Sequence, residues 1–216
     1  MRGAREEKHR FDLDGGTVAL DFVNTVSGMR GSASPRDRLQ GYPDLVYWAE
    51  QVGLVEGKRA SSLYALADDE PQRAAAAFAL AIRQREALHD VTLAAVDGLP
   101  TPEAALEIVN AWIGDAVAHR RFRAKGPGKF ERALEDDGDL LSFLRPVALD
   151  AAELLEHEVS NGLVGVCEER LVGRCAWLFL DATRNHSRRF CSMKDCGNRA
   201  KQRRHYQRSR SAAQKR

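Results

Sequence analysis

The spacing of hydrophobic residues predicts helices over most of the first 160 positions. From residue 45 to residue 52 the apolar side chains recur at offsets of 3, 4 and 7, which places them on one face of a helix over residues 44–52. Gly53 ends this helix. The longest helical pattern begins at residue 68 or 69 and ends at residue 96. Its acidic start, Pro71 in the first turn and its alanine-rich body are all typical of a helix.

Two further helices are predicted nearer the middle of the chain. Thr101 and Pro102 supply a capping hydroxyl and a first-turn proline for a helix over residues 101–116. A second amphipathic pattern covers residues 140–159, and this helix is expected to bend before Pro146.

The other segments of this part are short or lack periodicity. The apolar run over residues 20–26 is too brief to distinguish a helix from a strand. Gly126-Pro127-Gly128 predicts a turn, so residues 119–134 are expected to form a hairpin. Glycine and serine predict a loop over residues 28–35, and the charged residues 1–10 are expected to be disordered.

The pattern changes after Asn161-Gly162, which marks a domain boundary. Short strands are predicted next, with Trp177 and Phe179 on one face and Leu178 and Leu180 on the other. Because both faces are apolar, these strands are expected to pack between a helix and the neighbouring domain.

The last predicted element is a helix over residues 197–210 that has no apolar stripe, since only Ala200 and Tyr206 offer apolar surface. The sequence therefore predicts a mainly α protein. A helical domain with a small β element covers residues 1–160, and a second domain of short strands plus a basic helix covers residues 161–216.

Charge divides the chain at about the same place. The 216 residues contain 33 Lys/Arg and 31 Asp/Glu, for a net charge of +2. Residues 184–216 hold 12 of the basic residues and one acidic residue, which makes this segment +11 and leaves residues 1–183 at −9. Such asymmetry indicates that the basic end binds a polyanion, because cations that contact phosphates release condensed counterions.

All four cysteines also lie near that end, at Cys167, Cys175, Cys191 and Cys196, with spacings C-x7-C and C-x4-C. Four thiolates are the ligand set of a structural zinc ion, which prefers tetrahedral sulfur coordination. Two disulfides or four unrelated thiols are the alternatives; disulfides require an oxidising compartment, and the charged N-terminal residues show no secretory signal. His186 is an alternative fourth ligand to Cys167.

The residues around the second cysteine pair resemble the CGNR zinc-finger family. The resemblance rests on Trp-Leu-Phe-Leu-Asp at 177–181, Ser-Arg-Arg-Phe-Cys-Ser-Met at 187–193 and Cys-Gly-Asn-Arg-Ala-Lys at 196–201. It covers about fifty residues and implies one zinc ion per chain and a finger that binds DNA. The family usually places four residues between its first two cysteines, whereas this chain has seven, from Glu168 to Arg174.

The first 160 residues are similar to the ABATE domain of stress-related bacterial regulators. The matching segments are Leu-Asp-Phe-Val-Asn-Thr at 20–25, Asp-Leu-Val-Tyr-Trp at 44–48 and Arg-Glu-Ala-Leu at 85–88. The two resemblances together imply a transcription regulator whose larger domain senses a small-molecule effector. A cytoplasmic location and double-stranded DNA as the partner are expected, with a homodimer as the form that binds it.

Two sets of residues are candidates for binding. Cations near the zinc site and on the last helix are candidates for DNA contacts: Arg188, Arg189, Arg199, Lys201, Arg203, Arg204, Arg208 and Arg210. Those beside the cysteines would also favour thiolate over thiol. Polar residues within or near apolar runs are candidates for effector binding: Asp21, Asn24, Thr25 and Arg85. An internal cap and salt bridge is the alternative for this second set.

The sequence also limits other classes of function. It contains no nucleophile elbow, phosphate loop or cofactor motif, so catalysis is not expected. No apolar run is long enough for a membrane span. The alternatives to DNA binding are an RNA-binding protein and a small-molecule-binding protein whose zinc finger is only structural. Stacking aromatics for RNA are scarce, with Phe190 and Tyr206 as the candidates.

Overall fold

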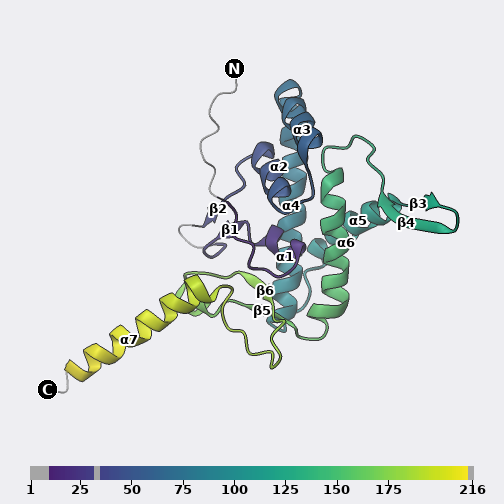
Figure 1. Ribbon diagram of the computed structural model, residues 1–216. Coiled ribbons are helices and arrows are strands. Elements are labelled where there is room, and N and C mark those ends of the chain that lie inside the picture. Colours follow the sequence, from purple (N-terminus) through teal and green to yellow (C-terminus); the bar gives the residue numbers. More distant parts are fainter. Residues whose placement is uncertain (1–9, 32–34, 214–216) are drawn as a thin grey trace.

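The computed structural model describes residues 10–31 and 35–213. Among these residues α-helices predominate, and the strands form three separate two-stranded antiparallel sheets (Figure 1). The helices are α1 (Val18–Val23), α2 (Tyr42–Gln51), α3 (Gly57–Asp69), α4 (Pro71–Val96), α5 (Glu103–Ala118), α6 (Arg145–Glu153) and α7 (Asn198–Ala213). The paired strands are β1 (Val26–Ser27) with β2 (Arg36–Asp37), β3 (Arg120–Gly126) with β4 (Lys129–Leu134), and β5 (Val164–Val166) with β6 (Leu178–Leu180). This confirms the predicted mainly α fold with small β elements; the segment 1–9, for which disorder is predicted, lies outside the described residues.

Helix α4 starts later than predicted, because a further helix precedes it. Asp68 and Asp69 end α3, and α4 begins at Pro71, so the predicted acidic start is wrong, whereas the first-turn proline and the end at residue 96 are confirmed. Helix α3 has a thin apolar face of Ala60, Leu63 and Ala67, which gives little periodic signal in the sequence.

Helix α5 also departs from its prediction. It begins two residues later than expected, and no side-chain hydrogen bond caps it, so the capping role predicted for Thr101 is wrong. The residue in the cap position is Pro102.

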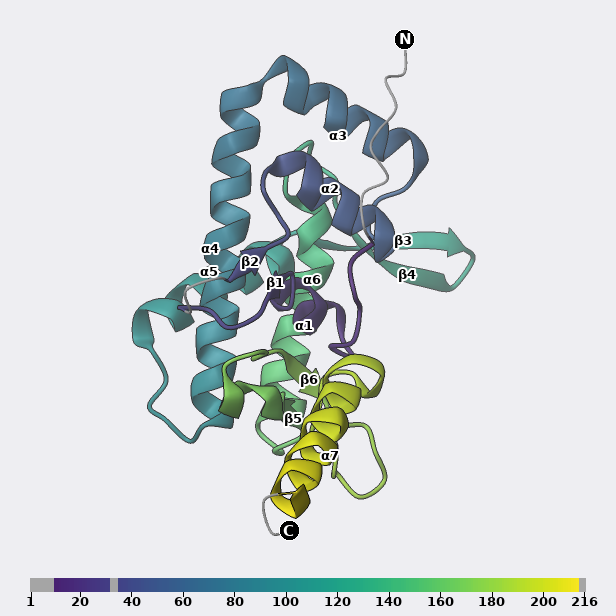
Figure 2. The same cartoon turned by 90° about the vertical axis from the view of Figure 1, so that its left-hand side faces the viewer.

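Helix α1 lies at the centre of the helical domain, where α2, α4, α5 and α6 surround it (Figures 1 and 2). The side chain of Thr17 caps α1 by accepting a hydrogen bond from the backbone of Leu20. The ring of Phe22 lies 5.0 Å from that of Trp48 and 6.1 Å from that of Trp112. Full burial of each such ring stabilises the core by about 1.5–3 kcal/mol, so the short segment 20–26 is fixed by packing more than by its own propensity.

The segment over residues 140–159 forms three consecutive helical pieces in place of one bent helix. A 3-10 turn, η1 (Ser142–Leu144), leads into α6, which has Pro146 in its first turn, and a π-helix, η2 (Leu154–Val159), follows. The type of helix thus changes just before Pro146, where a bend of a single helix was predicted, and again at Leu154.

The last quarter of the chain packs against the lower end of α1 and α4 (Figure 1). Leu178 of β6 joins the core of the helical domain, whereas Trp177 and Phe179 join a second cluster around the cysteines. This confirms the two apolar faces predicted for the strand. Helix α7 extends away from the body, and it continues to Ala213 within the described residues (Figures 1 and 2). Among the described residues, no helix has the length and apolar character that a membrane span requires.

Candidate metal centre and its attachment to the helical domain

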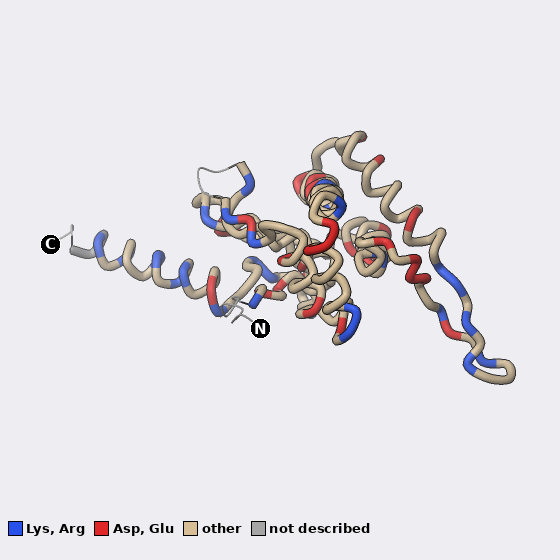
Figure 3. Tube along the Cα trace, turned by 90° about the horizontal axis from the view of Figure 1, so that it is seen from above, with Lys and Arg blue, Asp and Glu red and all other residues tan. Residues whose placement is uncertain are grey.

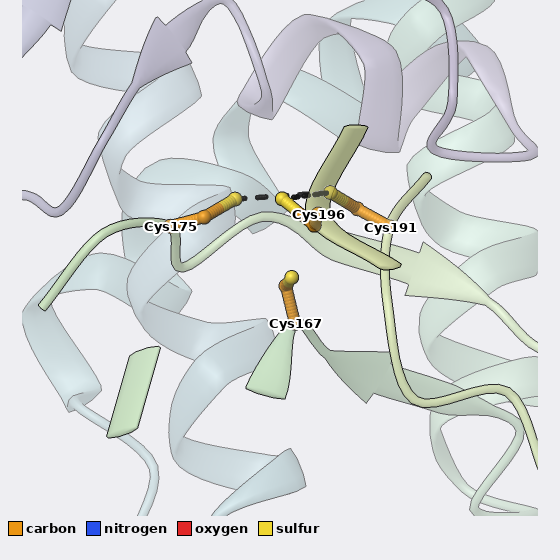
Figure 4. A group of neighbouring side chains, drawn as sticks. All are labelled: Cys167, Cys175, Cys191 and Cys196. Atoms are coloured by element: carbon orange, nitrogen blue, oxygen red, sulfur yellow. Dashed lines mark hydrogen bonds between the residues drawn. The ribbon is translucent and has the colours of Figure 1, made fainter. Parts of the chain in front are cut away.

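The four cysteines come from different local structures and converge at one point (Figure 4). Cys167 follows β5 directly, Cys175 lies three residues before β6, and Cys196 lies in a π-helical turn, η4 (Met193–Gly197). Their four sulfur atoms lie within 4.8 Å of one another. The Sγ atom of Cys191 lies 3.7 Å from that of Cys175 and 3.6 Å from that of Cys196.

These sulfur separations fit a tetrahedral zinc ion. With Zn–S bonds of about 2.3 Å, a regular tetrahedron places its sulfurs about 3.8 Å apart. All four cysteines are buried and none forms a disulfide. Cys167 belongs to the group despite its longer loop, whereas Nδ1 of His186 is hydrogen-bonded to the carbonyl oxygen of Asp181. The chain therefore has a four-cysteine site for one structural zinc ion, and both the disulfide alternative and His186 as a ligand are wrong.

The surroundings favour the thiolate form at Cys167, whereas side-chain hydrogen bonds with Cys167 raise the pKa of Cys175 and of Cys191. Hydrogen bonds from the thiols of Cys175, Cys191 and Cys196 hold the pKa of Cys167 far below its usual range. A guanidinium nitrogen of Arg199 lies 3.3 Å from the sulfur of Cys196 and donates to it. Since a zinc ion with four thiolates carries a formal charge of −2, this guanidinium partly offsets it.

Each residue of the Cys196-Gly197-Asn198-Arg199 sequence has an identifiable structural role. A Cβ atom added at Gly197 would lie 2.8 Å from the end of the Met193 side chain, which would have to move to make room for it. The side-chain amide of Asn198 donates to the carbonyl oxygen of Lys194, 2.9 Å away, which ties the turn to the start of α7. The motif thus fixes the direction in which α7 leaves the metal site.

The seven-residue loop between the first two cysteines forms a short 3-10 helix, η3 (Glu168–Val172), which holds α7. Glu169 is fully buried and accepts two hydrogen bonds from the guanidinium of Arg203, at 2.5 and 2.9 Å. This side-chain hydrogen bonding lowers the pKa of Glu169. Because the pair is bidentate, it fixes the orientation of α7 as well as its position.

Two other residues of η3 make ion pairs away from α7. Arg170 forms a bidentate pair with Asp97, the residue that follows α4, with N–O distances of 2.7 and 3.0 Å. Glu168 pairs with Arg189 on the segment before Cys191. The seven-residue loop between Cys167 and Cys175 therefore connects the metal site both to the helical domain and to the rest of the finger.

Asn24 is the main polar link between the helical domain and the metal site. Its Nδ2 donates to the carbonyl oxygen of Leu178 at 2.8 Å, and its Oδ1 accepts from the backbone nitrogen of Leu178 at 3.1 Å. Asn24 and Leu178 are both buried, 154 residues apart in the chain. The amide of Asn24 thus pairs with the backbone of β6 on the edge that faces away from β5, as a neighbouring strand would.

Further hydrogen bonds continue this junction along β6. The indole nitrogen of Trp177 donates to the carbonyl oxygen of Val26 at 2.7 Å, and the backbone nitrogen of Leu180 donates to the carbonyl oxygen of Gly15 at 2.7 Å. Gly16 has φ +96, and a Cβ atom added there would lie 3.0 Å from Leu180, so glycine suits this close approach. The metal module is therefore attached along a continuous line and is not tethered by a flexible linker.

The other three candidates for effector binding also have partners within the protein. The hydroxyl of Thr25 donates to the carbonyl oxygen of Phe22 and accepts from Arg85, while Arg85 forms a bidentate pair with Asp37 at 2.6 and 2.9 Å. Asp21 accepts from the backbone of Gly15, and burial raises its pKa to about 6. This arrangement matches the internal cap and salt bridge named as the alternative; their role in effector binding stays a prediction.

The eight candidate DNA-binding cations fall into two groups. Four have partners near the metal site: Arg188, Arg189, Arg199 and Arg203. The guanidinium of Arg188 is the most constrained, since it donates to the carbonyl oxygens of Asp14 and Leu180 and lies 4.5 Å from the ring centre of Phe179. The other four are exposed along α7: Lys201, Arg204, Arg208 and Arg210. DNA contact by either group stays a prediction.

Comparisons with known families agree with this architecture. Residues 16–158 match the ABATE family model, whose description is "putative stress-induced transcription regulator". Residues 164–209 match the CGNR zinc finger. A search of curated proteins found no match. Because the first match covers well over half of the chain and the second contains all four zinc-binding cysteines, the chain belongs to the ABATE family and carries a CGNR zinc finger.

Proposed function

We propose that this protein is a non-catalytic transcription regulator that binds double-stranded DNA through α7. The observation that carries the proposal is the exposed, cationic surface of a helix that starts at the zinc site and extends away from the body (Figure 3). Among the described residues, Lys201, Arg204, Arg208 and Arg210 form no ion pair with an acidic side chain. Their charges are therefore available to phosphates.

The dimensions of α7 suit the major groove. Its 16 residues span roughly 24 Å at about 1.5 Å per residue. A helix with side chains is about 10–12 Å wide, close to the width of the major groove of B-DNA. Arg203 and Arg199 orient the first turns, which leaves Arg204 and Arg208 one turn apart on the exposed surface for phosphate or guanine contacts.

Salt dependence of binding tests this role. The double variant Arg204→Gln/Arg208→Gln is expected to weaken binding to duplex DNA and to reduce the slope of log K against log salt by up to about 1.8, since each phosphate contact contributes about 0.9. The matched control is Arg36→Gln/Lys58→Gln, which removes two exposed cations from the helical domain. An unchanged slope in the α7 variant, with zinc content intact, would refute the proposal.

The same titration separates the two alternatives. An RNA-binding protein would prefer single-stranded or structured RNA to a duplex of the same length at equal salt. A finger with only a structural role would give the α7 variant and the control the same small effect. The proposed regulator is a homodimer in the bacterial cytoplasm, and sedimentation of the DNA complex checks the two-chain stoichiometry.

We also propose that the helical domain binds a small apolar effector between α4 and α5. A cavity of about 640 Å³ lies there, within the size range of small-molecule sites. Its lining is mainly apolar and includes Leu80, Ile108, Trp112 and Leu141. The charged residues of the lining are Arg73, Arg83, Arg145, Asp115, Asp137 and Asp139. Fluorescence of anilinonaphthalene sulfonate, an apolar anion, is expected to rise with the wild type and not with Ala111→Trp, which fills the cavity. Equal fluorescence with both proteins would contradict this site.

A further inference from the structure

The hairpin of β3 and β4 is a second projecting element of this molecule. Figures 1 and 3 show it extending from the side opposite to α7. Every residue of β3 is exposed, and so are Lys129, Phe130 and Arg132 of β4. The two strands pair in register from Arg120 opposite Leu134 to Ala124 opposite Phe130. The hairpin therefore presents side chains on both faces to the surroundings.

Its charge is opposite to that of the domain that carries it. The hairpin contains six cations: Arg120, Arg121, Arg123, Lys125, Lys129 and Arg132. With Glu131 and Glu135 included, residues 120–135 carry +4, whereas the rest of residues 1–183 carry −13. The positive potential is therefore concentrated on this arm, well away from α7.

Four of these cations have no acidic partner among the residues that the structure describes. Arg121 pairs with Glu135 at 3.0 Å, and Lys125 pairs with Glu131 at 2.6 Å. The remaining four are Arg120, Arg123, Lys129 and Arg132. These four charges lack a structural explanation within the fold.

Two aromatic rings stand beside them. Phe122 is 73% exposed and Phe130 is 70% exposed, values that are high for phenylalanine in any folded protein. The strand register places Phe122 directly opposite Arg132, and Phe130 diagonally across from Phe122, so that these three side chains share one face. Exposed rings flanked by cations match the side chains that bind phosphodiester chains and stack on bases.

We propose that the β3–β4 hairpin is a second nucleic-acid-binding element. Its four unpartnered cations contact phosphates, and Phe122 and Phe130 contact base faces. A two-stranded ribbon fits a DNA groove, and apolar side chains on such arms insert between base steps. The proposal deepens the DNA-binding function proposed above, but it uses no residue of α7 or of the zinc site.

The positions of α7 and the β3–β4 hairpin determine how many nucleic-acid segments one chain can bind. Because α7 and the hairpin extend from opposite sides of the molecule, they contact separate stretches of nucleic acid (Figures 1 and 3). Each chain is therefore expected to bind two short duplexes at saturation, and either element alone is expected to bind one. A long duplex that reaches both elements has to bend, or two duplexes are brought together.

The test compares four full-length, zinc-loaded proteins side by side. These are the wild type, the hairpin variant Arg120→Gln/Arg123→Gln/Lys129→Gln/Arg132→Gln, the α7 variant Arg204→Gln/Arg208→Gln, and their combination. For B-DNA the hairpin variant is expected to lose up to about 3.6 from the salt slope, and on a single strand up to about 2.8. The Arg36→Gln/Lys58→Gln protein is again the control, and circular dichroism checks that the fold is retained.

A separate variant tests the aromatic contacts. Phe122→Ser/Phe130→Ser retains all charges, so it is expected to weaken binding about tenfold or more with the salt slope unchanged. Comparing a duplex with a single strand of the same sequence shows whether the rings act in a groove or stack on unpaired bases. Equal affinity of this variant and the wild type for both nucleic acids would overturn the role of the rings.

The outcomes also separate this proposal from the one on α7. If the hairpin substitutions reduce the salt slope of binding, both alone and combined with the α7 variant, nucleic-acid binding by the hairpin is supported. This holds even where the α7 variant behaves like the wild type. An unchanged slope in the hairpin variant overturns it, whatever α7 does. A lower sedimentation mass together with an unchanged slope would assign the hairpin to the acidic surface of a second copy of the chain, and would equally overturn the proposal.

Discussion

Replacing Asn24 by Ala is expected to detach the zinc module from the helical domain while each retains its own fold. The substitution removes both hydrogen bonds to Leu178, whose N–H and C=O groups are then buried without these partners. An unsatisfied buried backbone group costs about 1–3 kcal/mol, so the two together lower the stability of the junction by about 2–6 kcal/mol. The zinc ligands are untouched, since both of these side-chain hydrogen bonds of Asn24 go to the backbone of Leu178.

Urea unfolding followed by two signals measures this change. Tryptophan fluorescence reports mainly on Trp48 and Trp112 in the helical core, and a chelating dye reports the release of zinc. The two transitions are expected to coincide in the wild type and to separate in Asn24→Ala, with zinc released at lower urea. The control is Asn110→Ala, an exposed amide on α5, for which the change is expected to stay within about 0.5 kcal/mol. Coincident transitions in Asn24→Ala, at the wild-type midpoint, would refute the reasoning.

Three other substitutions probe the metal site, its support by η3 and a buried carboxyl group of the helical domain. Cys196→Ser is expected to reduce bound zinc to well below one per chain and to unfold residues 164–210, with most of the helical circular dichroism retained; unchanged metal content by elemental analysis would contradict the ligand set. Glu169→Gln is expected to lower the urea midpoint for zinc release at pH 7, because the buried pair with Arg203 loses its charge; an unchanged midpoint would count against that role for η3. Asp21→Asn is expected to be more stable than the wild type above pH 6. Burial raises the pKa of Asp21 from 3.8 in the unfolded chain to about 6, so its favourable contribution is present below pH 3.8 and is lost as the pH rises through 6. The stability difference should change by at most about 1.4 kcal/mol per pH unit in that window, and a constant difference would show that Asp21 titrates normally.

The features that the sequence predicted correctly are those with local signals. The long helix, the hairpin around Gly126-Pro127-Gly128 and the basic helix after Cys196 each follow from spacing or turn chemistry within a few residues. The cysteine set belongs to the same class, because four thiols in two close pairs within thirty residues are a typical ligand set for zinc. Even Cys167, with its longer loop, could be assigned to the site from its residue type.

The features that were missed depend on contacts between distant segments. Asn24 stood out as a polar group in an apolar run, but nothing near it in the chain indicated that its partner is the backbone of Leu178. Glu169, in a charged loop, would ordinarily be solvated, and it is buried only because α7 brings Arg203 to it. A sequence pattern shows that a buried polar residue needs a partner, and it takes the fold to show which one.

The positive charges on α7 fall into two groups, those that have partners within the finger and those that have no acidic partner in the part of the chain that the structure describes. Near the metal site Arg199 faces the sulfur of Cys196 and Arg203 faces Glu169, so these two positive charges are balanced by groups of the finger itself. Farther along, Arg204 and Arg208 are like charges at positions i and i+4, which destabilises an isolated helix by a few tenths of a kcal/mol. No acidic side chain among the described residues offsets these two charges. Folding alone would favour neutral residues there, so these charges support the proposed binding of a polyanion to this face of the helix, and the four uncompensated cations of the β3–β4 hairpin support the second proposed site in the same way.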